Sequence, residues 1–193
     1  MTLPESVLEV AGRAVERTRS RPPTLGRGRL ICVDGPAGAG KTTLSAAIEL
    51  ADPDAHVVHC DELLQGWRGL PGLGATVEKL LRPLAEGEES AWTRWAWDRD
   101  EWAESHTVSP GGLLVLEGTG CWAPAYADLV GTLVWVEAPR DLRLARGMAR
   151  DGEHMREEWL TWLADEAELH ELLGTRAHAD VIVDGTGATG PGA

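Results

Sequence analysis

Short apolar runs alternate along the chain with longer stretches in which apolar residues recur every three or four positions. A run that is apolar throughout is typical of a strand buried on both faces of a parallel sheet. The wider spacing places apolar residues on one face of a helix. We therefore expect five strands, at residues 29–33, 55–60, 113–116, 131–136 and 179–183.

The amphipathic stretches before, between and after these runs predict the helices. Strands that alternate with helices pair in parallel and leave the helices packed on both faces of the sheet. We therefore expect one α/β domain, residues 1–185, with a five-stranded parallel sheet as the middle of three layers. Helices are expected at residues 4–18, 43–50, 75–84, 124–129, 139–150 and 151–173, with a break at Gly152.

Two segments between the second and third strands lack a clear period. Residues 66–74 are rich in glycine, and residues 86–105 are acidic and rich in tryptophan, so we expect a loop and then a short helix over 86–105. These segments lie within an insertion, at about residues 62–106, that we expect to bind the substrate. Residues 186–193 contain glycine and proline and predict a flexible tail.

A glycine-rich motif connects the first predicted strand to the next helix. Residues 35–42 read Gly-Pro-Ala-Gly-Ala-Gly-Lys-Thr, which matches the phosphate-binding pattern G-x-x-x-x-G-K-[ST]. The glycines let the backbone curl around an anion, and the helix adds the positive end of its dipole. Lys41 can reach the β- and γ-phosphates, and the Thr42 hydroxyl can bind Mg²⁺. The expected nucleotide-binding residues of this loop are Gly35, Pro36, Ala37, Gly38, Ala39, Gly40, Lys41, Thr42 and Thr43.

Acidic residues follow three of the predicted strands. Asp34 ends the first strand, Asp61 the second and Glu117 the third. Because the carboxyl ends of parallel strands meet at one edge of the sheet, we expect these carboxylates beside the phosphate-binding loop. Glu117 suits a Mg²⁺ ligand and Asp61 suits the base that accepts the proton of an attacking hydroxyl, while Asp34 and Glu117 suit contacts to the substrate. The alternative is that acidic residues end strands as turn formers.

Three arginines share one face of a predicted helix. Arg143, Arg146 and Arg150 are spaced i, i+3 and i+7. A closing arginine face can cancel charge on transferring phosphoryl oxygens and exclude water. We expect a lid at about residues 143–155, with Arg143 on the nucleotide and with Arg146 and Arg150 in catalytic roles. The alternative is a basic helix face that only contacts solvent.

Tryptophan is frequent in this chain, which contains nine tryptophans and no phenylalanine. Tryptophan stacks on flat rings and on the apolar faces of sugars, and it can also fill a core that lacks phenylalanine. We expect Trp67 and Trp97 to line the substrate pocket, and Trp135 and Trp159 to lie in the core. Trp122 could take either place.

Charge and chain length narrow the range of partners. A net charge of −13 makes nucleic acid and anionic membranes poor partners. No apolar stretch approaches the ~20 residues that span a bilayer, and the first residues lack a signal-peptide core, so we expect a cytoplasmic protein. Cys32, Cys60 and Cys121 have no metal-ligand spacing and are expected to be buried thiols.

Five segments of the chain resemble a known family. Residues 31–43 resemble the opening of small P-loop kinases of the nucleoside and nucleotide kinase group. Residues 116–118 (Leu-Glu-Gly) resemble the end of the third strand in uridine kinases, and residues 142–151 resemble their arginine-rich lid. Residues 59–64 resemble the second-strand motif whose aspartate is the proposed base, and residues 179–185 resemble the last strand.

The resemblance covers about residues 30–185 and carries implications for fold and activity. It implies a P-loop NTPase fold, ATP and Mg²⁺ as cofactors, and transfer of the γ-phosphoryl group to a hydroxyl of a small molecule. Uridine kinases also carry a Tyr-Asp-Phe/Tyr element that holds the nucleoside. Its counterpart here is residues 94–98, where Ala96 replaces the aspartate and Asp98 is the candidate to take over its role.

Two questions stay open on the sequence alone. The acceptor hydroxyl could belong to a nucleoside, a nucleotide, a sugar or a specialised metabolite. The function could also be that of a regulatory or switch-type NTPase, which hydrolyses nucleotide without a small-molecule acceptor. The absence of an Asn/Thr-Lys-x-Asp guanine motif and the presence of the lid pattern favour the kinase.

Overall fold

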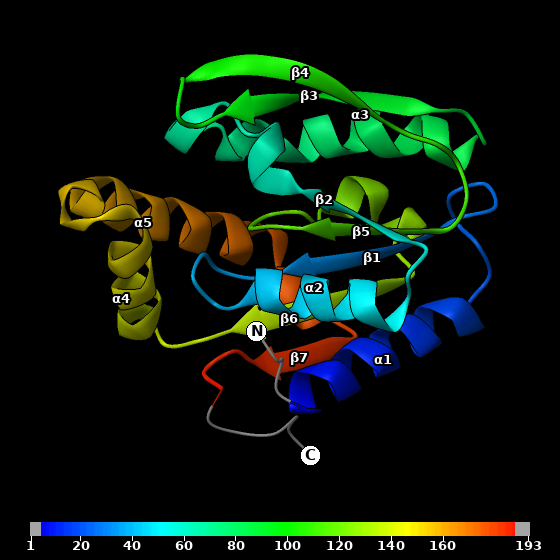
Figure 1. Ribbon diagram of the computed structural model, residues 1–193, viewed down its shortest axis with the longest axis horizontal. Coiled ribbons are helices and arrows are strands. Elements are labelled where there is room, and N and C mark those ends of the chain that lie inside the picture. Colours follow the sequence, from blue (N-terminus) through cyan, green and yellow to red (C-terminus); the bar gives the residue numbers. More distant parts are fainter. Residues whose placement is uncertain (1–4, 188–193) are drawn as a thin grey trace.

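A five-stranded parallel sheet forms the middle layer of the molecule, seen in a computed structural model that describes residues 5–187 (Figure 1). Its strands are β1 (Arg29–Asp34), β2 (Ala55–His59), β5 (Leu113–Glu117), β6 (Thr132–Glu137) and β7 (Val181–Asp184). Their order is β2-β5-β1-β6-β7, and every pairing between neighbours is parallel. The predicted fold class is thereby confirmed, with each strand within two residues of its expected position.

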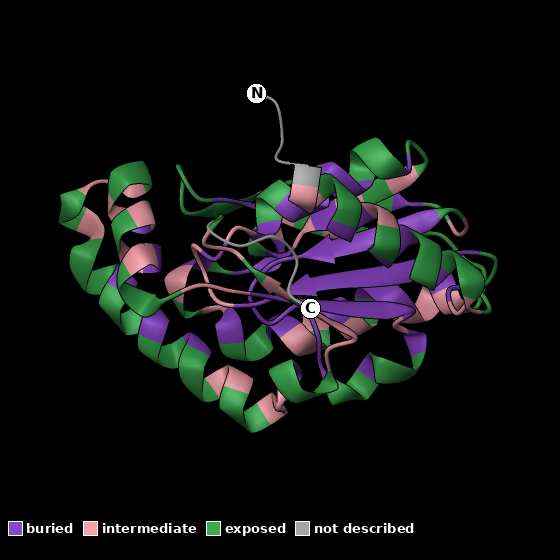
Figure 2. Ribbon diagram, turned by 90° about the horizontal axis from the view of Figure 1, so that it is seen from below, coloured by how far each residue is buried: buried purple, intermediate pink, exposed green. Residues whose placement is uncertain are grey.

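Helices cover both faces of the sheet and leave their outer sides exposed (Figure 2). Short 3₁₀ turns connect several of them: η1 (Cys60–Leu63), η2 (Gly66–Arg68), η3 (Leu70–Gly72), η4 (Pro124–Leu129) and η5 (Glu153–Met155). The α-helices are α1 (Glu5–Ser20), α2 (Lys41–Ala51), α3 (Leu73–Ala85), α4 (Arg140–Asp151), α5 (Arg156–Leu173) and α6 (Thr175–His178).

The central strand divides its side chains between two cores. Successive residues of a strand point to opposite faces of the sheet. Ile31 and Val33 pack in the core that α1 and α2 complete, whereas Leu30 and Cys32 pack in the core that α3 and Trp162 of α5 complete. Burial on both faces explains why the strands read as unbroken apolar runs. The three cysteines are buried, as expected.

Residues 86–105 do not form the expected loop and short helix. They belong largely to an antiparallel hairpin of β3 (Ser90–Ala96) and β4 (Glu101–Val108), which lies beside α3 in Figure 1. The pairing is irregular between Thr93 and Trp95, and this irregularity breaks the two-residue alternation that marks a strand. The exposed acidic residues of β4 also resemble a loop composition. The prediction for this segment was therefore wrong.

Several of the remaining helix boundaries follow the sequence closely, whereas residues 124–129 form the 3₁₀ helix η4 and α6 was not expected. Gly152 adopts φ 95° and ends α4, as its expected break requires, and the chain passes through η5 before α5 begins. The helix expected at 75–84 starts at Leu73, after two 3₁₀ turns, and keeps Pro83 in its last turn. Residues 188–193 of the expected tail lie outside the described residues. Within residues 5–187, no helix combines the length and apolar character that crossing a bilayer requires.

Candidate active site

A cavity of about 910 Å³ lies at the carboxyl ends of the strands, and residues that end or follow all five strands contribute to its wall. β1 lies in the middle of the sheet, with β5 on one side and β6 on the other. Open α/β sheets bind ligands at the carboxyl ends of such central strands, where the strand order reverses. The predicted site residues on this wall are Ala37, Gly38, Gly40, Lys41, Thr42, Thr43, Asp61, Trp67, Trp97, Glu117, Arg146 and Arg150.

The loop after β1 curls back on itself before α2 begins. Gly38 and Gly40 adopt φ of 77° and 107°, a region that favours glycine. The Ala39 N–H donates to the Pro36 carbonyl at 3.2 Å, which tightens the curl. A Cβ at Gly35 would lie 2.1 Å from the Val136 carbonyl oxygen, so this glycine lets the loop sit directly against β6.

Lys41 begins α2 and extends across the mouth of the loop. Its Nζ donates to the Pro36 carbonyl at 3.1 Å and to Thr119 Oγ1 at 3.2 Å. The Thr119 hydroxyl in turn donates to the Gly35 carbonyl at 3.1 Å. Among residues 5–187, no carboxylate forms an ion pair with this ammonium group, so its charge is available to an anion in the cavity.

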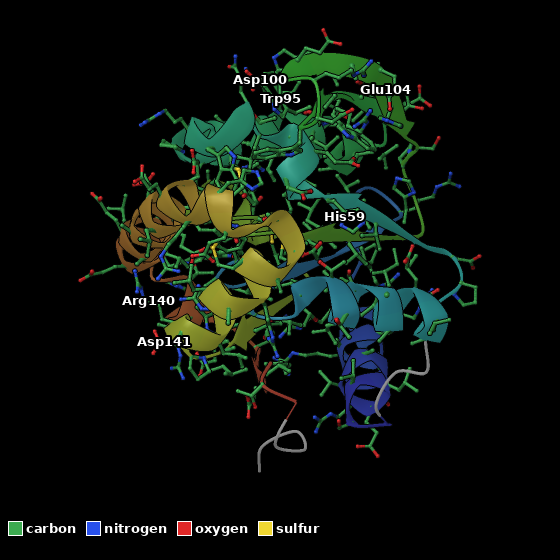
Figure 3. All side chains as sticks on the ribbon, turned by 60° about the vertical axis from the view of Figure 1, so that its left-hand side comes forward. His59, Trp95, Asp100, Glu104, Arg140 and Asp141 are labelled. Atoms are coloured by element: carbon green, nitrogen blue, oxygen red, sulfur yellow. The ribbon has the colours of Figure 1, made fainter. Side chains whose placement is uncertain are left out.

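A hydroxyl and a carboxylate meet beside the loop. Thr42 Oγ1 donates to Glu117 Oε1 at 3.4 Å, and His59 Nδ1 lies 2.8 Å from Glu117 Oε2. The hydrogen bond to Glu117 raises the pKa of His59. Figure 3 shows His59 at the end of β2, below the hairpin that carries Trp95. Two hard oxygen donors fit Mg²⁺, so Thr42 and Glu117 are the residues that could hold this ion. The described residues hold no cluster of three or more His, Cys, Asp or Glu that could bind a metal ion by itself.

Asp61 lies in η1, directly after β2, and faces the cavity. Asp61 is exposed at the cavity, and the protein that forms the cavity around its carboxyl raises the pKa of this group, with the negative charge of Glu117 adding to the effect. His59 and Lys41 oppose the shift to a smaller extent. A carboxylate whose pKa is raised accepts a proton more readily than an ordinary aspartate.

Asp34 was expected to contact the substrate, but the structure places it elsewhere. The residue is fully buried and does not line the cavity. Its carboxylate accepts hydrogen bonds from the backbone N–H groups of Gly35, Gly120 and Trp122, at 2.6 to 2.9 Å, and it lies 3.2 Å from His170 Nε2. Asp34 therefore fixes the loops after β1 and β5 from beneath. This part of the prediction is corrected.

Arg143 was expected to bind the nucleotide, but it too lies beneath the loop. Its Nη1 is 2.5 Å from Glu166 Oε1 of α5 and also donates to the Ala37 carbonyl at 3.2 Å. The other oxygen of Glu166 accepts the Ala37 N–H at 2.8 Å and the Trp162 indole N–H at 3.1 Å. Both backbone groups of Ala37 are thus held by one buried ion pair, and Arg143 positions the loop.

The other two arginines of α4 line the cavity, with different partners. Arg146 donates to the backbone carbonyls of Gly38 and Gly185, each at 3.0 Å. Arg150 pairs with Asp151 at 2.7 Å and lies over the Trp159 ring, 5.6 Å from its centroid. Both guanidinium groups are therefore present at the cavity, where the lid was expected.

Four tryptophans cluster near Asp61. The Trp67 ring lies edge-on to Trp97, Trp159 and Trp162, with centroids 5.7, 6.1 and 5.8 Å away. Trp67 and Trp97 line the cavity, where they were expected, and the Trp97 indole N–H donates to the Asp61 carbonyl at 3.1 Å. Trp135 and Trp159 are buried in the interior, as expected, and so is Trp122.

Asp98 was the candidate to replace the missing aspartate of the uridine-kinase element. It lies exposed in the turn between β3 and β4 and does not line the cavity, so the structure gives it no contact with a substrate there. Ala96, at the position of the missing aspartate, is fully buried. The expectation that Asp98 takes over the role of the missing aspartate is therefore corrected.

Several residues of the site were not identified from the sequence. Thr119 was overlooked, although it follows the Glu117-Gly118 pair. Glu166 lies on an acidic helix, where nothing distinguishes it from its exposed neighbours. Ser6, Val7 and Val10 of α1 line the cavity as well, although the helix precedes every motif in the sequence.

The sheet order, the curled glycine loop and the lysine at its mouth define the chain as a protein of the P-loop NTPase fold. Two solved structures share the fold. A possible uridine kinase from Bacillus stearothermophilus has a TM-score of 0.61 and 16% identity, covering 92% of this chain and 99% of that one. A candidate fructose transport system kinase from Silicibacter sp. TM1040 has a TM-score of 0.61 and 21% identity, covering 94% and 98%.

These likenesses confirm the fold that the sequence resemblance implied, which is the fold of uridine-kinase-like P-loop kinases. No protein-family model matches the chain, and no curated protein matches it.

Proposed function

We propose that this protein is an ATP-dependent kinase that transfers the γ-phosphoryl group to a hydroxyl of a small molecule. The observation that carries the proposal is the placement of Lys41 and Asp61 on the wall of one cavity. Among residues 5–187 no carboxylate pairs with the Lys41 ammonium group, and Asp61 is a carboxylate whose pKa is raised. Phosphoryl transfer to an alcohol requires a cation that binds the phosphate and a group that accepts the proton of the alcohol.

The loop residues supply the phosphate site in this proposal. The Ala37 N–H is engaged by Glu166, and Pro36 has no N–H. The Ala39 N–H is engaged by the Pro36 carbonyl, so the backbone donors toward the phosphates come from Gly38 and from residues 40–42. Lys41 neutralises the β- and γ-phosphate oxygens. Thr42 and Glu117 would hold Mg²⁺, which would shield the phosphate charge.

The acceptor hydroxyl approaches from the side of Asp61. Its oxygen forms the new bond to the γ-phosphorus as the bond from that phosphorus to ADP breaks, and its proton passes to the Asp61 carboxylate. Arg146 and Arg150 lie beside the transferring group, with the lid at about residues 143–155. Because Arg143 and Arg146 both donate to carbonyls of the loop, the part of this lid that can close begins beyond Arg146.

A switch-type NTPase is the competing function, and one assay separates the two. ADP release from Mg·ATP is measured with the purified protein, first in water alone and then with a panel of small-molecule alcohols. The kinase predicts that an alcohol stimulates ADP release and becomes phosphorylated in equal amount. Release at the same rate with and without every alcohol would instead support the NTPase.

A further inference from the structure

The part of the cavity next to Asp61 has an aromatic and apolar wall. Trp67, Trp97 and Trp162 line it together with Leu64 and Met155. The edge-on contacts of Trp67 with Trp97 and Trp162 join these rings into one surface. The hydrogen bond from Trp97 to the Asp61 backbone holds this surface beside the proposed base. A flat ring can bury its face here with little rearrangement.

Few polar side chains near this wall could form hydrogen bonds with the edge of a sugar or a nucleobase: besides Asp61, they are Asp151 and His154. The chain contains no asparagine, and its one glutamine, Gln65, is absent from the described wall of the cavity. Asp151 already accepts hydrogen bonds from Arg150 and from the Trp159 indole. A polyol that entered this space would leave hydroxyls without partners, and each unpaired polar group disfavours binding.

The charges of the cavity also limit the acceptor. Among the described residues, its basic side chains other than histidine are Lys41, Arg146 and Arg150. Arg146 is held by backbone carbonyls and Arg150 by Asp151, and the triphosphate itself requires positive charge. The carboxylates of Asp61 and Asp151 face the acceptor end. A phosphate or carboxylate on the acceptor would meet the like charge of these two carboxylates there, and the arginine beside them, Arg150, is already paired with Asp151.

We propose that the acceptor is an alcohol carried by a planar aromatic ring, with no phosphate or other anionic group. This inference rests on the proposed kinase function and names its substrate class. The ring stacks on the surface formed by Trp67 and Trp97, and its hydroxyl is directed at Asp61. The acceptor is selected by ring area rather than by hydrogen bonds to a polar edge.

A panel of small alcohols tests the acceptor class through ADP release. Benzyl alcohol and indole-3-ethanol represent neutral ring alcohols, 4-(hydroxymethyl)benzoate adds an anionic group, and ribose and ribose 5-phosphate represent polyols. The expected result is at least about tenfold higher kcat/KM for the neutral ring alcohols than for the benzoate or either ribose compound, since loss of stacking or an unpaired polar group each reduces binding to this extent.

A matched pair of variants tests the aromatic wall. Trp97→Ala is expected to raise KM for the ring alcohols about five- to tenfold and to leave KM for ATP unchanged, while Trp97→Phe restores most of the loss. Trp102→Ala is the control, because Trp102 lies on β4 with 45% of its surface exposed and outside the cavity wall. It is expected to behave as the wild type.

Three results would overturn the inference: ribose or the benzoate as an acceptor at least as good as the ring alcohols, no stimulation by any ring alcohol, or no effect of Trp97→Ala on KM. These results are distinct from a failure of the kinase proposal itself. That failure would show as an absence of Mg·ATP binding or as ADP release that no alcohol of the panel stimulates. A wrong acceptor class would instead show as phosphorylation of ribose, ribose 5-phosphate or the benzoate in place of the neutral ring alcohols.

Discussion

Asp61 occupies a position in which its charged form is disfavoured. Surrounding protein and the charge of Glu117 raise the pKa of its carboxyl, so the folded protein binds this proton more tightly than the unfolded chain does. By linkage, the group lowers the stability of the fold at pH values above the folded pKa, and this effect disappears as pH falls below the unfolded pKa. The same property makes the residue a better proton acceptor near neutral pH.

Replacing this carboxyl with an amide separates its chemical role from its effect on stability. Asp61→Asn is expected to raise Tm at pH 7, because the disfavoured charge is gone, and to lower kcat for acceptor phosphorylation about 10²–10⁴-fold, because the base is gone. Calorimetric melting and the ADP-release assay measure the two effects.

The pH dependence provides the control for this variant. The gain in Tm over the wild type should shrink as pH falls through the raised pKa of Asp61, since the wild-type carboxyl then becomes neutral. A constant gain at all pH values, or a variant that keeps wild-type kcat, would contradict the role given to Asp61.

The helices α4 and α5 reach the phosphate loop through one buried ion pair. Arg143 comes from α4 and Glu166 from α5, with 10% and 1% of their side chains exposed, and together they hold the N–H and the carbonyl of Ala37. Removing one member of a buried pair leaves the other charge without a partner. The pair therefore sets the position of the loop relative to both helices.

Arg143→Met is expected to destabilise the fold by about 3–5 kcal/mol in urea unfolding, because Glu166 then stays buried and unpaired. Arg143→Met with Glu166→Leu should recover part of the loss, since no buried charge remains. Arg82→Met is the surface control. Arg82 forms exposed ion pairs with Glu78 and Asp128, so this substitution should change the free energy of unfolding much less. Equal losses for Arg143→Met and Arg82→Met would refute the positioning role.

Close packing between β7 and the loop gives a second test of how the loop is held. A Cβ at Gly185 would lie 1.8 Å from the Ala39 carbonyl oxygen, so Gly185→Ala must displace the loop. We expect a loss of at least about tenfold in Mg·ATP affinity, comparable to the loss of one good electrostatic contact. Titration calorimetry measures it.

Gly12→Ala is the matched control for this glycine. Gly12 lies within α1, and a Cβ there would meet no atom within 4 Å. This substitution is expected to stabilise the fold by about 0.5–1 kcal/mol, because alanine restricts the unfolded chain and favours the helix. Unchanged nucleotide affinity in Gly185→Ala would show that the contact between Gly185 and the loop does not hold the loop in place.

Much of the molecule could be predicted from its sequence because strand burial and the loop motif are local signals. The five apolar runs gave the sheet, and residues 35–42 gave the phosphate loop. The roles of Arg143 and Asp34 could not be predicted, because helical spacing or strand position places a side chain on a face without naming its partner. The role of Glu166 is recognisable only once α4 and α5 are packed together, and the irregular pairing of β3 with β4 hides the two-residue alternation of the hairpin.

The central claim is that a magnesium–nucleotide complex binds in the cavity at the mouth of the loop, against Lys41. Titration calorimetry of the wild type and of Lys41→Ala with a non-hydrolysable ATP analogue and Mg²⁺ tests it most directly. The account predicts one site in the wild type and about 10²–10³-fold weaker binding in Lys41→Ala, if the lysine acts as other single electrostatic donors do. No binding to the wild type, or equal binding to both proteins, would contradict it.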